Sequence, residues 1–341
     1  MNAKEIIYKN KPLTLHKSIT FPRFNEKTVL VTNTWEYVDL WLNRNKKKEA
    51  RFFWNQARSF YEATLNLQKT SAPLTAYYCF LNAAKTLLLT KGHQFSDQHG
   101  VSGFTVIGPT ALSNEKIKIK NGGILPAICS LFGEAVNPQQ IYTLKDLLYN
   151  LPYIHRAFNL TFTDSELFIP LNNPRIVKSH QTHEAWFVAE LTGKYANLRT
   201  IRKIPTGFQH DISVLDKTVI RSTHRFDWRP KQIALTLDRY KNYHARIRND
   251  VVYIHADKNK WYLKRGGAVN GVINRNTLVL AFAAMHRLSE LSRYSPDKLE
   301  KHFDCQHNWL LSEFIQSAPN QFIDAISAEI TGHEFFAPER I

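Results

Sequence analysis

The residue types that bind metals and transfer protons gather in two short stretches of this sequence. They are His180, His183 and Glu184 in the first stretch, and His302, Asp304, Cys305 and His307 in the second. A zinc site needs four ligands, or three and a water, that converge on one point. The order of His and Glu in the first stretch matches no zinc-protease motif. The four residues of the second stretch are too close in sequence to converge easily on one metal ion. We therefore expect a polar loop and a group of surface residues between helices, with no metal and no cofactor.

Other catalytic motifs have no good match either. Thr192-Gly193-Lys194-Tyr195 lacks the upstream glycine and the hydroxyl residue of a phosphate-binding loop. Cys79 lies within an apolar stretch, which predicts a buried thiol rather than a nucleophile. The motifs therefore assign no nucleotide hydrolase and no cysteine enzyme.

The charge of the chain is strongly positive. It has 45 Lys and Arg against 29 Asp and Glu, a net charge of +16. Such an excess favours contact with nucleic acid or another polyanion. It also fits a protein whose charge only sets its solubility, or one that binds an acidic protein, and composition leaves these alternatives open.

Basic and aromatic residues are most closely mixed in and just before a predicted helix over 230–248. Cations that contact phosphates, beside rings that stack on bases, are typical of proteins that bind nucleic acid. The alternative is a solvated basic face over a tyrosine-lined core. The residues that we expect to contact nucleic acid are Arg225, Arg229, Lys231, Arg239, Lys241, Tyr243 and Arg246.

Hydrophobic spacing predicts an α+β fold that is mainly helical. Two helices, over 49–69 and 73–90, are joined by a short turn, so we expect an antiparallel helical hairpin at the core. Short apolar alternations then predict a β-rich insert, followed by C-terminal helices. We expect four regions: an N-terminal segment (1–45), a helical domain with the hairpin (46–158), the β-rich insert (159–228), and a C-terminal helical region with a short β-hairpin (229–341).

Several local signals fix details of this plan. Gly92 predicts the end of one helix and Asn276 the start of another. Pro296 and Pro319 predict boundaries between short C-terminal helices. Lysine and isoleucine alternate over 116–120, which predicts a solvated edge strand.

Cysteine content and hydropathy indicate the compartment. Three cysteines form no disulfide framework, which favours a reducing interior. The most apolar run, 72–89, contains Pro73, Asn82 and Lys85, and therefore predicts a core helix rather than a membrane span. The N-terminus shows no apolar signal segment. We expect a cytoplasmic protein without a membrane partner.

The order of several segments resembles that of the YaaC-like family of bacterial proteins. These segments are Pro73-Leu74, Tyr77-Tyr78, Leu81-Asn82 and Lys85, the loop Gln98-His99-Gly100, the helix start Trp228-Arg229-Pro230, and Leu288 to Pro296. The resemblance covers most of the chain. It implies a bacterial, intracellular, helix-rich protein, and it brings no activity with it.

The aromatic hairpin also resembles, more distantly, HEPN domains, which are helical modules of prokaryotic toxins and defence systems. Active HEPN ribonucleases carry an arginine and a histidine separated by four to six residues, and Arg248 and His255, with six residues between them, match this spacing at its upper limit. The resemblance implies that His255 takes the proton of a ribose 2′-hydroxyl and that Arg248 stabilises the phosphorane, without a metal. The residues between them are typical of a strand, however, and a structural hairpin is the alternative.

We therefore expect an accessory protein that binds nucleic acid or a protein partner, and the HEPN resemblance implies a bacterial defence assembly. One alternative is a metal-independent ribonuclease that uses Arg248 and His255. Another is a non-catalytic scaffold for an acidic protein. The sequence also leaves open whether the protein forms a homo-oligomer.

Overall fold

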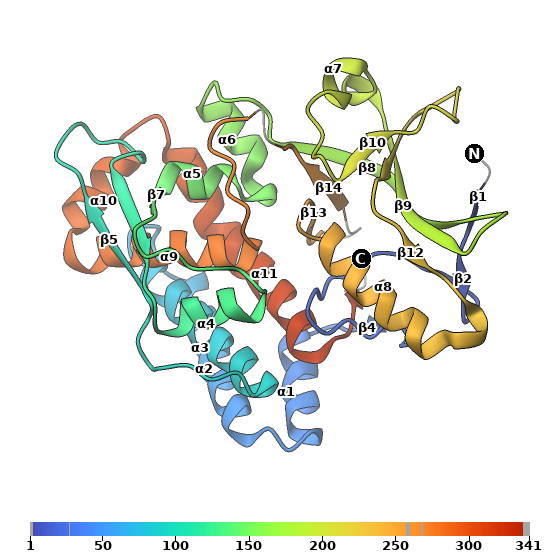
Figure 1. Cartoon of the computed structure of the whole chain (residues 1–341). Coiled ribbons are helices and arrows are strands. Elements are labelled where there is room, and N and C mark those ends of the chain that lie inside the picture. The colour runs from blue at the N-terminus through green and yellow to red at the C-terminus, as the bar shows by residue number, and fades with distance from the viewer. Residues whose placement is uncertain (1–2, 27, 257–259, 267–268, 337–341) are drawn as a thin grey trace.

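The structure is a computed structural model that describes residues 3–26, 28–256, 260–266 and 269–336. Most helices gather in one half of the molecule and the largest sheet in the other (Figure 1). The fold is therefore mixed α+β. Within the described residues, no helix combines the length and the apolar character needed to cross a membrane.

Helix α3 (Ala72–Lys91) lies at the centre of the helical half. Its side chains are mostly apolar and buried, and its C-terminus is capped by Gly92 in the left-handed conformation, as predicted. Helix α2 (Lys48–Leu65) runs antiparallel to it: Thr64 Oγ1 lies 2.8 Å from Thr75 Oγ1, and Thr86 Oγ1 donates to the Ala50 carbonyl at 3.2 Å.

Helices α9 (Thr277–Tyr294) and α11 (Asn308–Thr331) cover other sides of α3. Phe80 stacks on Phe322 of α11 at 3.9 Å, and Tyr77 meets Phe282 of α9 edge to face at 5.3 Å. Asn276 caps α9 by accepting from the Leu278 amide, as predicted. The remaining helices of this half are α1 (Thr34–Arg44), α4 (Ile124–Leu131), α5 (Leu144–Tyr149), α6 (His155–Thr161) and α10 (Pro296–Phe303), with a 3₁₀ turn at Pro152–Ile154.

Two local predictions are wrong in this half. Pro319 lies inside α11 rather than between helices. It is buried in the core, where packing of the whole helix outweighs the one hydrogen bond that a proline loses. The Lys/Ile strand β6 (Glu115–Ile119) is not an edge, because it pairs with both β5 (Val101–Thr105) and β7 (Ile141–Thr143).

The other half is an antiparallel sheet in the order β10-β11-β9-β8-β14-β13, with β1 on β8 and β12 on β9. Its strands are β1 (Ala3–Glu5), β8 (Phe168–Ser179), β9 (Glu184–Leu191), β10 (Phe208–His210), β11 (Thr218–Ser222), β12 (Phe226–Asp227), β13 (Val251–Ile254) and β14 (Lys260–Lys264). The sheet therefore includes the expected β-rich stretch, but it also takes β1 from the N-terminal segment and β13 and β14 from the C-terminal region. Helix α8 (Ile233–Ile247) packs on it through Tyr240, Tyr243 and Ile247.

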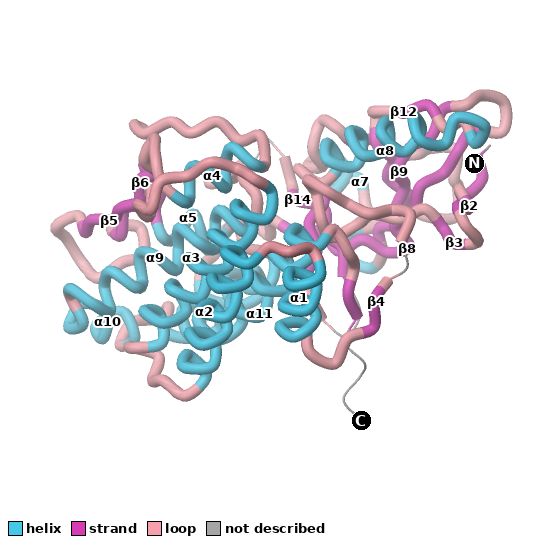
Figure 2. The backbone as a smooth tube through the Cα atoms, turned by 90° about the horizontal axis from the view of Figure 1, so that it is seen from below, coloured by secondary structure: helices cyan, strands magenta, loops and turns pink. Residues whose placement is uncertain are grey.

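Figure 2 shows the same division from a second direction, with α8 over the strands β9 and β12 and α2, α3, α9 and α11 on the other side. The shorter elements are β2 (Ile7–Tyr8), β3 (Lys11–Pro12), β4 (Val29–Leu30), α7 (Leu198–Ile201), β15 (Phe335–Phe336) and 3₁₀ turns at Gly193–Tyr195 and Pro230–Gln232. Strand β15 pairs in parallel with β4 and so brings the C-terminal segment beside the N-terminal one.

Residues 16–23, here named the strap, connect the two halves. On the sheet side, the His16 amide donates to His244 of α8 at 3.0 Å. On the helical side, the buried ammonium of Lys17 pairs with Asp324 of α11 at 2.9 Å. The strap is therefore fixed at its start to both halves of the molecule.

Candidate nucleic-acid interface

Three of the arginines expected to bind nucleic acid already have partners in the protein. Arg229 Nε and Arg239 Nη1 both contact the Asp227 carboxylate, at 2.8 and 2.7 Å. Arg225 lies over the Trp186 ring at 4.6 Å and donates to the His224 carbonyl at 3.0 Å. A phosphate at any of them competes with these internal contacts.

The prediction that Tyr243 stacks on a base conflicts with its place in the core. Its side chain is 5% exposed, and its hydroxyl accepts a hydrogen bond from the Phe187 amide at 2.7 Å. Helical periodicity places Tyr243 on the same face as Tyr240, and that face packs on the sheet. Tyr243 therefore belongs to the tyrosine-lined core that was the alternative interpretation of this helix.

The other three predicted cations lie along the outside of α8 and its start. Lys231 and Arg246 are exposed. The Lys241 ammonium lies 5.0 Å from the centre of the Phe21 ring, which belongs to the strap. Lys241 therefore connects the predicted surface with a residue that the sequence patterns did not select.

Phe21 lies at the centre of a group of cations. Its ring is 42% exposed, and the Lys91 ammonium lies 4.2 Å from the ring centre. Burial lowers the pKa of Lys91 to about 8; Glu329 opposes this shift, and the charges of Arg23, Lys241 and Lys47 add to it. We name Phe21, Arg23, Lys47, Lys91 and Lys241 the Phe21 cluster.

The strap holds Phe21 at this surface through the end of α11. The buried Glu329 carboxylate accepts hydrogen bonds from the Ser18 hydroxyl at 2.9 Å and the Ile19 amide at 2.6 Å. It also accepts from the Thr20 amide at 3.2 Å and the Thr20 hydroxyl at 2.6 Å. The Arg23 amide donates to the Gly332 carbonyl at 3.0 Å. Because charge-assisted hydrogen bonds are strong, Phe21 is presented from a fixed backbone.

The sequence patterns gave little sign of this cluster. Its members come from residues 21–23, the α1–α2 loop, the end of α3 and the middle of α8. Lys47 belongs to a basic triplet for which a solvated linker was the preferred interpretation and a phosphate contact the lesser one. Only the fold brings it within electrostatic reach of Lys91.

A cavity of about 750 Å³ opens between the two halves, lined by Ile19 of the strap and Arg246 of α8 among others. Burial lowers the pKa of Lys264 in its wall to about 8, and burial raises the pKa of Asp250 to about 6. The Lys264 ammonium donates to the Ile273 carbonyl. This contact ties β14 to the segment that precedes α9, and it gives Lys264 a structural role.

Arg248 lies at the C-terminus of α8 and is 6% exposed. Its guanidinium donates to the carbonyls of His16 at 2.7 Å, Lys17 at 2.8 Å and Val251 at 2.9 Å. These bonds join α8, the strap and β13. The HEPN resemblance implies that Arg248 stabilises a phosphorane, but its guanidinium already donates hydrogen bonds to backbone carbonyls.

His255 follows strand β13, so the hairpin expected as the alternative to a helical motif is confirmed. Its Nδ1 lies 3.0 Å from Asp324 Oδ1, and its amide donates to Gln321 Oε1 at 2.9 Å. The catalytic role of Arg248 and His255 stays a prediction.

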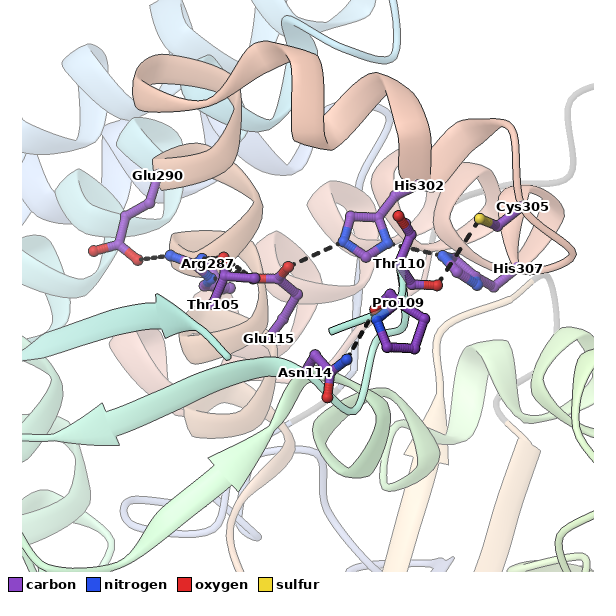
Figure 3. Close-up of polar contacts among 10 residues, drawn as sticks. All are labelled: Thr105, Pro109, Thr110, Asn114, Glu115, Arg287, Glu290, His302, Cys305 and His307. Atoms are coloured by element: carbon purple, nitrogen blue, oxygen red, sulfur yellow. Dashed lines mark hydrogen bonds and ion pairs between the residues drawn. The ribbon is translucent and has the colours of Figure 1, made fainter. Parts of the chain in front are cut away.

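The second metal-type stretch is only partly at the surface: Asp304 is exposed and Cys305 half-buried, whereas the two histidines are buried. His302 and His307 are 2% and 3% exposed; their Nδ1 and Nε2 atoms lie 2.9 Å apart, and His302 Nε2 lies 3.1 Å from Glu115 Oε1 (Figure 3). His302 thus contacts its two neighbours through different ring nitrogens, so the three do not point to a common centre. Packing around α10 and β6 buries His302 and His307, which the local sequence predicted to lie at the surface. The first stretch, 180–184, is an exposed loop that runs into β9, as expected.

The comparisons with known proteins concern the family alone. The model described as "YaaC-like Protein" matches residues 17–330, which is nearly the whole chain. Searches of the curated proteins and of the solved structures found no match. The HEPN resemblance gains no support from the comparisons. Since the family match covers both the helical half and the sheet, this chain belongs to the YaaC-like protein family.

Proposed function

We propose that this protein binds single-stranded nucleic acid through the Phe21 cluster, as a cytoplasmic accessory subunit of a bacterial defence assembly. The proposal also keeps the α2–α3 hairpin as the core of a mainly helical fold. The observation that carries the binding function is an exposed phenyl ring with two ammonium groups near it, at 4.2 and 5.0 Å from the ring centre. The defence role rests only on the distant HEPN resemblance.

Physical reasoning supports this assignment. The charges of Arg23, Lys241 and Lys47 disfavour the charged form of Lys91, and phosphate groups would relieve that repulsion. A ring that protrudes among cations can stack on an unpaired base, which is how sequence-tolerant single-strand binders combine charge and stacking. A base within a duplex has no free face, so the cluster fits single strands better.

The first test is the affinity for a short labelled RNA and for DNA of the same sequence. Phe21→Ala should weaken binding roughly tenfold, because one base–aromatic stack contributes about 1–3 kcal/mol. Lys241→Ala should reduce the slope of log affinity against log salt by about 0.7, the value for one phosphate contact on a single strand. Lys298→Ala, which removes an exposed lysine on α10, is the matched control and should bind like wild type.

Gel assays with the same labelled RNA and DNA also separate the alternative functions. Incubation in EDTA shows whether RNA is cut, and cleavage that disappears in His255→Ala would make the protein a metal-independent ribonuclease. Binding that Phe21→Ala and Lys241→Ala leave unchanged would move the interface elsewhere. Absence of any shift at low salt would contradict nucleic-acid binding and favour a scaffold for an acidic protein.

Binding should also depend on pH through Lys91. Its pKa is about 8, so the ammonium loses its proton as pH rises from 7 to 9, and the attraction to phosphate falls with it. Affinity should therefore decrease over this range. In Lys91→Met the affinity should be lower and nearly constant between pH 7 and 9, whereas an unchanged decrease would assign the titration to another group.

A further inference from the structure

A second pocket lies between α3, α9 and the loop that precedes β5. Its volume is about 470 Å³, and it is lined by Tyr77, His99 and His286 among others. The three rings are packed together: Tyr77 lies 5.3 Å from His99 and 4.9 Å from His286, and the two histidines are 5.8 Å apart. Much of the lining comes from the segments in which the sequence resembles its family.

Two buried polar atoms of this pocket lack a hydrogen-bond partner in the described structure. They are the Tyr77 hydroxyl and His286 Nδ1, on side chains that are 2% and 5% exposed. The carboxylate nearest to His286 Nδ1, that of Glu290, is 3.8 Å away, which is too far for a hydrogen bond. Buried groups of this kind are nearly always paired, so their place in the wall of a pocket indicates a ligand that bonds to them.

The backbone around His99 is built to hold its position. The amides of Ile124 and Leu125, at the start of α4, donate to the carbonyls of Gln98 and His99 at 2.8 and 3.2 Å. Gly123 has a φ of +119°, and a Cβ there would lie 2.5 Å from the Gly100 nitrogen. A side chain at Gly123 would push the loop away, so the close approach requires glycine.

The charges of the pocket favour an anion. Lys120 and Arg293 line it with a single carboxylate, that of Glu290. Glu290 accepts a hydrogen bond from Arg287 at 2.9 Å and another from the Gly103 amide at 3.3 Å. The rim cations therefore remain available for a negatively charged group, while Tyr294 beside them adds an exposed ring.

The inner rings are neutral near pH 7. Burial lowers the pKa of His286 to about 3, and burial followed by the charges of Lys85, Arg293 and Lys120 lowers the pKa of His99. Burial raises the pKa of the Tyr77 hydroxyl. Neutral imidazoles and a phenol donate and accept hydrogen bonds without charge, which suits the edge of a nitrogen heterocycle.

We propose that this pocket binds a nucleoside monophosphate, with its planar base against the group formed by Tyr77, His99 and His286 and its phosphate at Lys120 and Arg293. The Tyr77 hydroxyl and His286 Nδ1 are buried in the ligand-free protein, so the two side chains would shift to pair with the base. This site is separate from the Phe21 cluster in its residues, and it takes one nucleotide rather than a strand.

Behind the pocket, a buried chain of polar contacts holds Glu290 in place (Figure 3). Arg287 contacts Glu290 on one side and Glu115 on the other, at 2.9 and 2.7 Å. A Cβ at Gly103 would lie 2.4 Å from the Arg287 side chain, so β5 leaves room for this pair only because it has glycine there. The pairing neutralises the Glu290 charge in the wall of the pocket.

The test is titration calorimetry of the full chain with AMP, GMP, CMP and UMP, each beside its nucleoside and inorganic phosphate. At least one nucleotide should bind saturably at one site. Its nucleoside and phosphate alone should bind at least about tenfold more weakly, since each lacks half of the contacts. Failure of all four nucleotides to saturate the protein at about 1 mM would overturn the proposal.

Tyr77→Phe is the sharpest variant, because it removes the hydroxyl and keeps the ring. A merely structural Tyr77 would lose an unpaired buried group, so the ligand-free protein should unfold at the same or a higher temperature. Nucleotide affinity should fall about tenfold all the same. Arg293→Ala should weaken the nucleotide but not its nucleoside.

The two nucleic-acid proposals are distinguished by a cross-control. The double variant Phe21→Ala/Lys241→Ala should keep its nucleotide affinity, and Tyr77→Phe should keep its affinity for single-stranded RNA. Nucleotide binding that is unchanged in both Tyr77→Phe and Arg293→Ala would place the nucleotide outside this pocket and refute the assignment.

Discussion

Arg287→Ala is expected to destabilise the protein by about 3–5 kcal/mol, because it leaves a buried carboxylate without its main counter-charge. Arg287 is 7% exposed in its side chain and Glu115 is 2% exposed. The arginine donates to Glu115 Oε2 through Nε at 2.9 Å and Nη2 at 2.7 Å. After the substitution, His302 and the Thr105 hydroxyl remain as partners of Glu115 in the described core.

The measurement is urea unfolding of wild type, Arg287→Ala, Arg287→Met and Arg58→Ala. Arg287→Met keeps much of the packing, so its loss should be close to that of alanine if charge dominates. Arg58 pairs with Glu62 on the surface of α2, and Arg58→Ala should cost less than about 1 kcal/mol. An equal loss of unfolding free energy in Arg287→Ala and Arg58→Ala would show that the buried pair contributes no more to stability than the surface pair.

The pH dependence of this effect has a defined sign. Burial raises the pKa of Glu115, but hydrogen bonds from His302 and Arg287 outweigh it and lower the pKa below its ordinary value. A lowered carboxylate pKa gives stability that is present above the ordinary pKa and is lost as pH falls through the native one. The difference between wild type and Arg287→Ala should therefore be largest near neutral pH and shrink in acid.

Gly332→Ala is expected to destabilise the protein by about 2–4 kcal/mol, as left-handed strain and steric overlap add together. Gly332 caps α11 with a φ of +75°, and a Cβ there would lie 2.5 Å from the Phe21 carbonyl oxygen. The strap must move to make room. Since the strap presents Phe21, affinity for single-stranded RNA should fall to about the level of Phe21→Ala.

Gly92 offers the matched control for stability. It caps α3 with a φ of +67°, and a Cβ there would meet nothing within 4 Å. Gly92→Ala should therefore cost only the strain, about 1 kcal/mol. Thermal and urea unfolding of Gly332→Ala and Gly92→Ala isolates the effect of the contact with the strap. An equal loss of unfolding free energy in the two variants would mean that the strap moves aside without destabilising the protein.

Local sequence determined the elements of this protein because their signals act over a few residues. The apolar run at 72–89 forms α3, Gly92 ends it, and Asn276 begins α9. The strand character of 251–254 is also correct, and it argued in advance against a helical catalytic motif. The signal of Pro319 was overridden, since a buried helix gains more from packing than one proline removes.

Only the tertiary structure decided the two candidate sites. The Phe21 cluster joins residues 21, 23, 47, 91 and 241, and the proposed nucleotide pocket joins residues 77, 99, 120, 286 and 293. The same holds for Tyr243 and for His302 and His307, whose burial depends on what packs over them. Helical or strand spacing sets which residues share one face, whereas packing between distant segments sets which faces meet. Both candidate sites lie where such faces meet, and the sequence by itself could supply the cations and rings but not their neighbours.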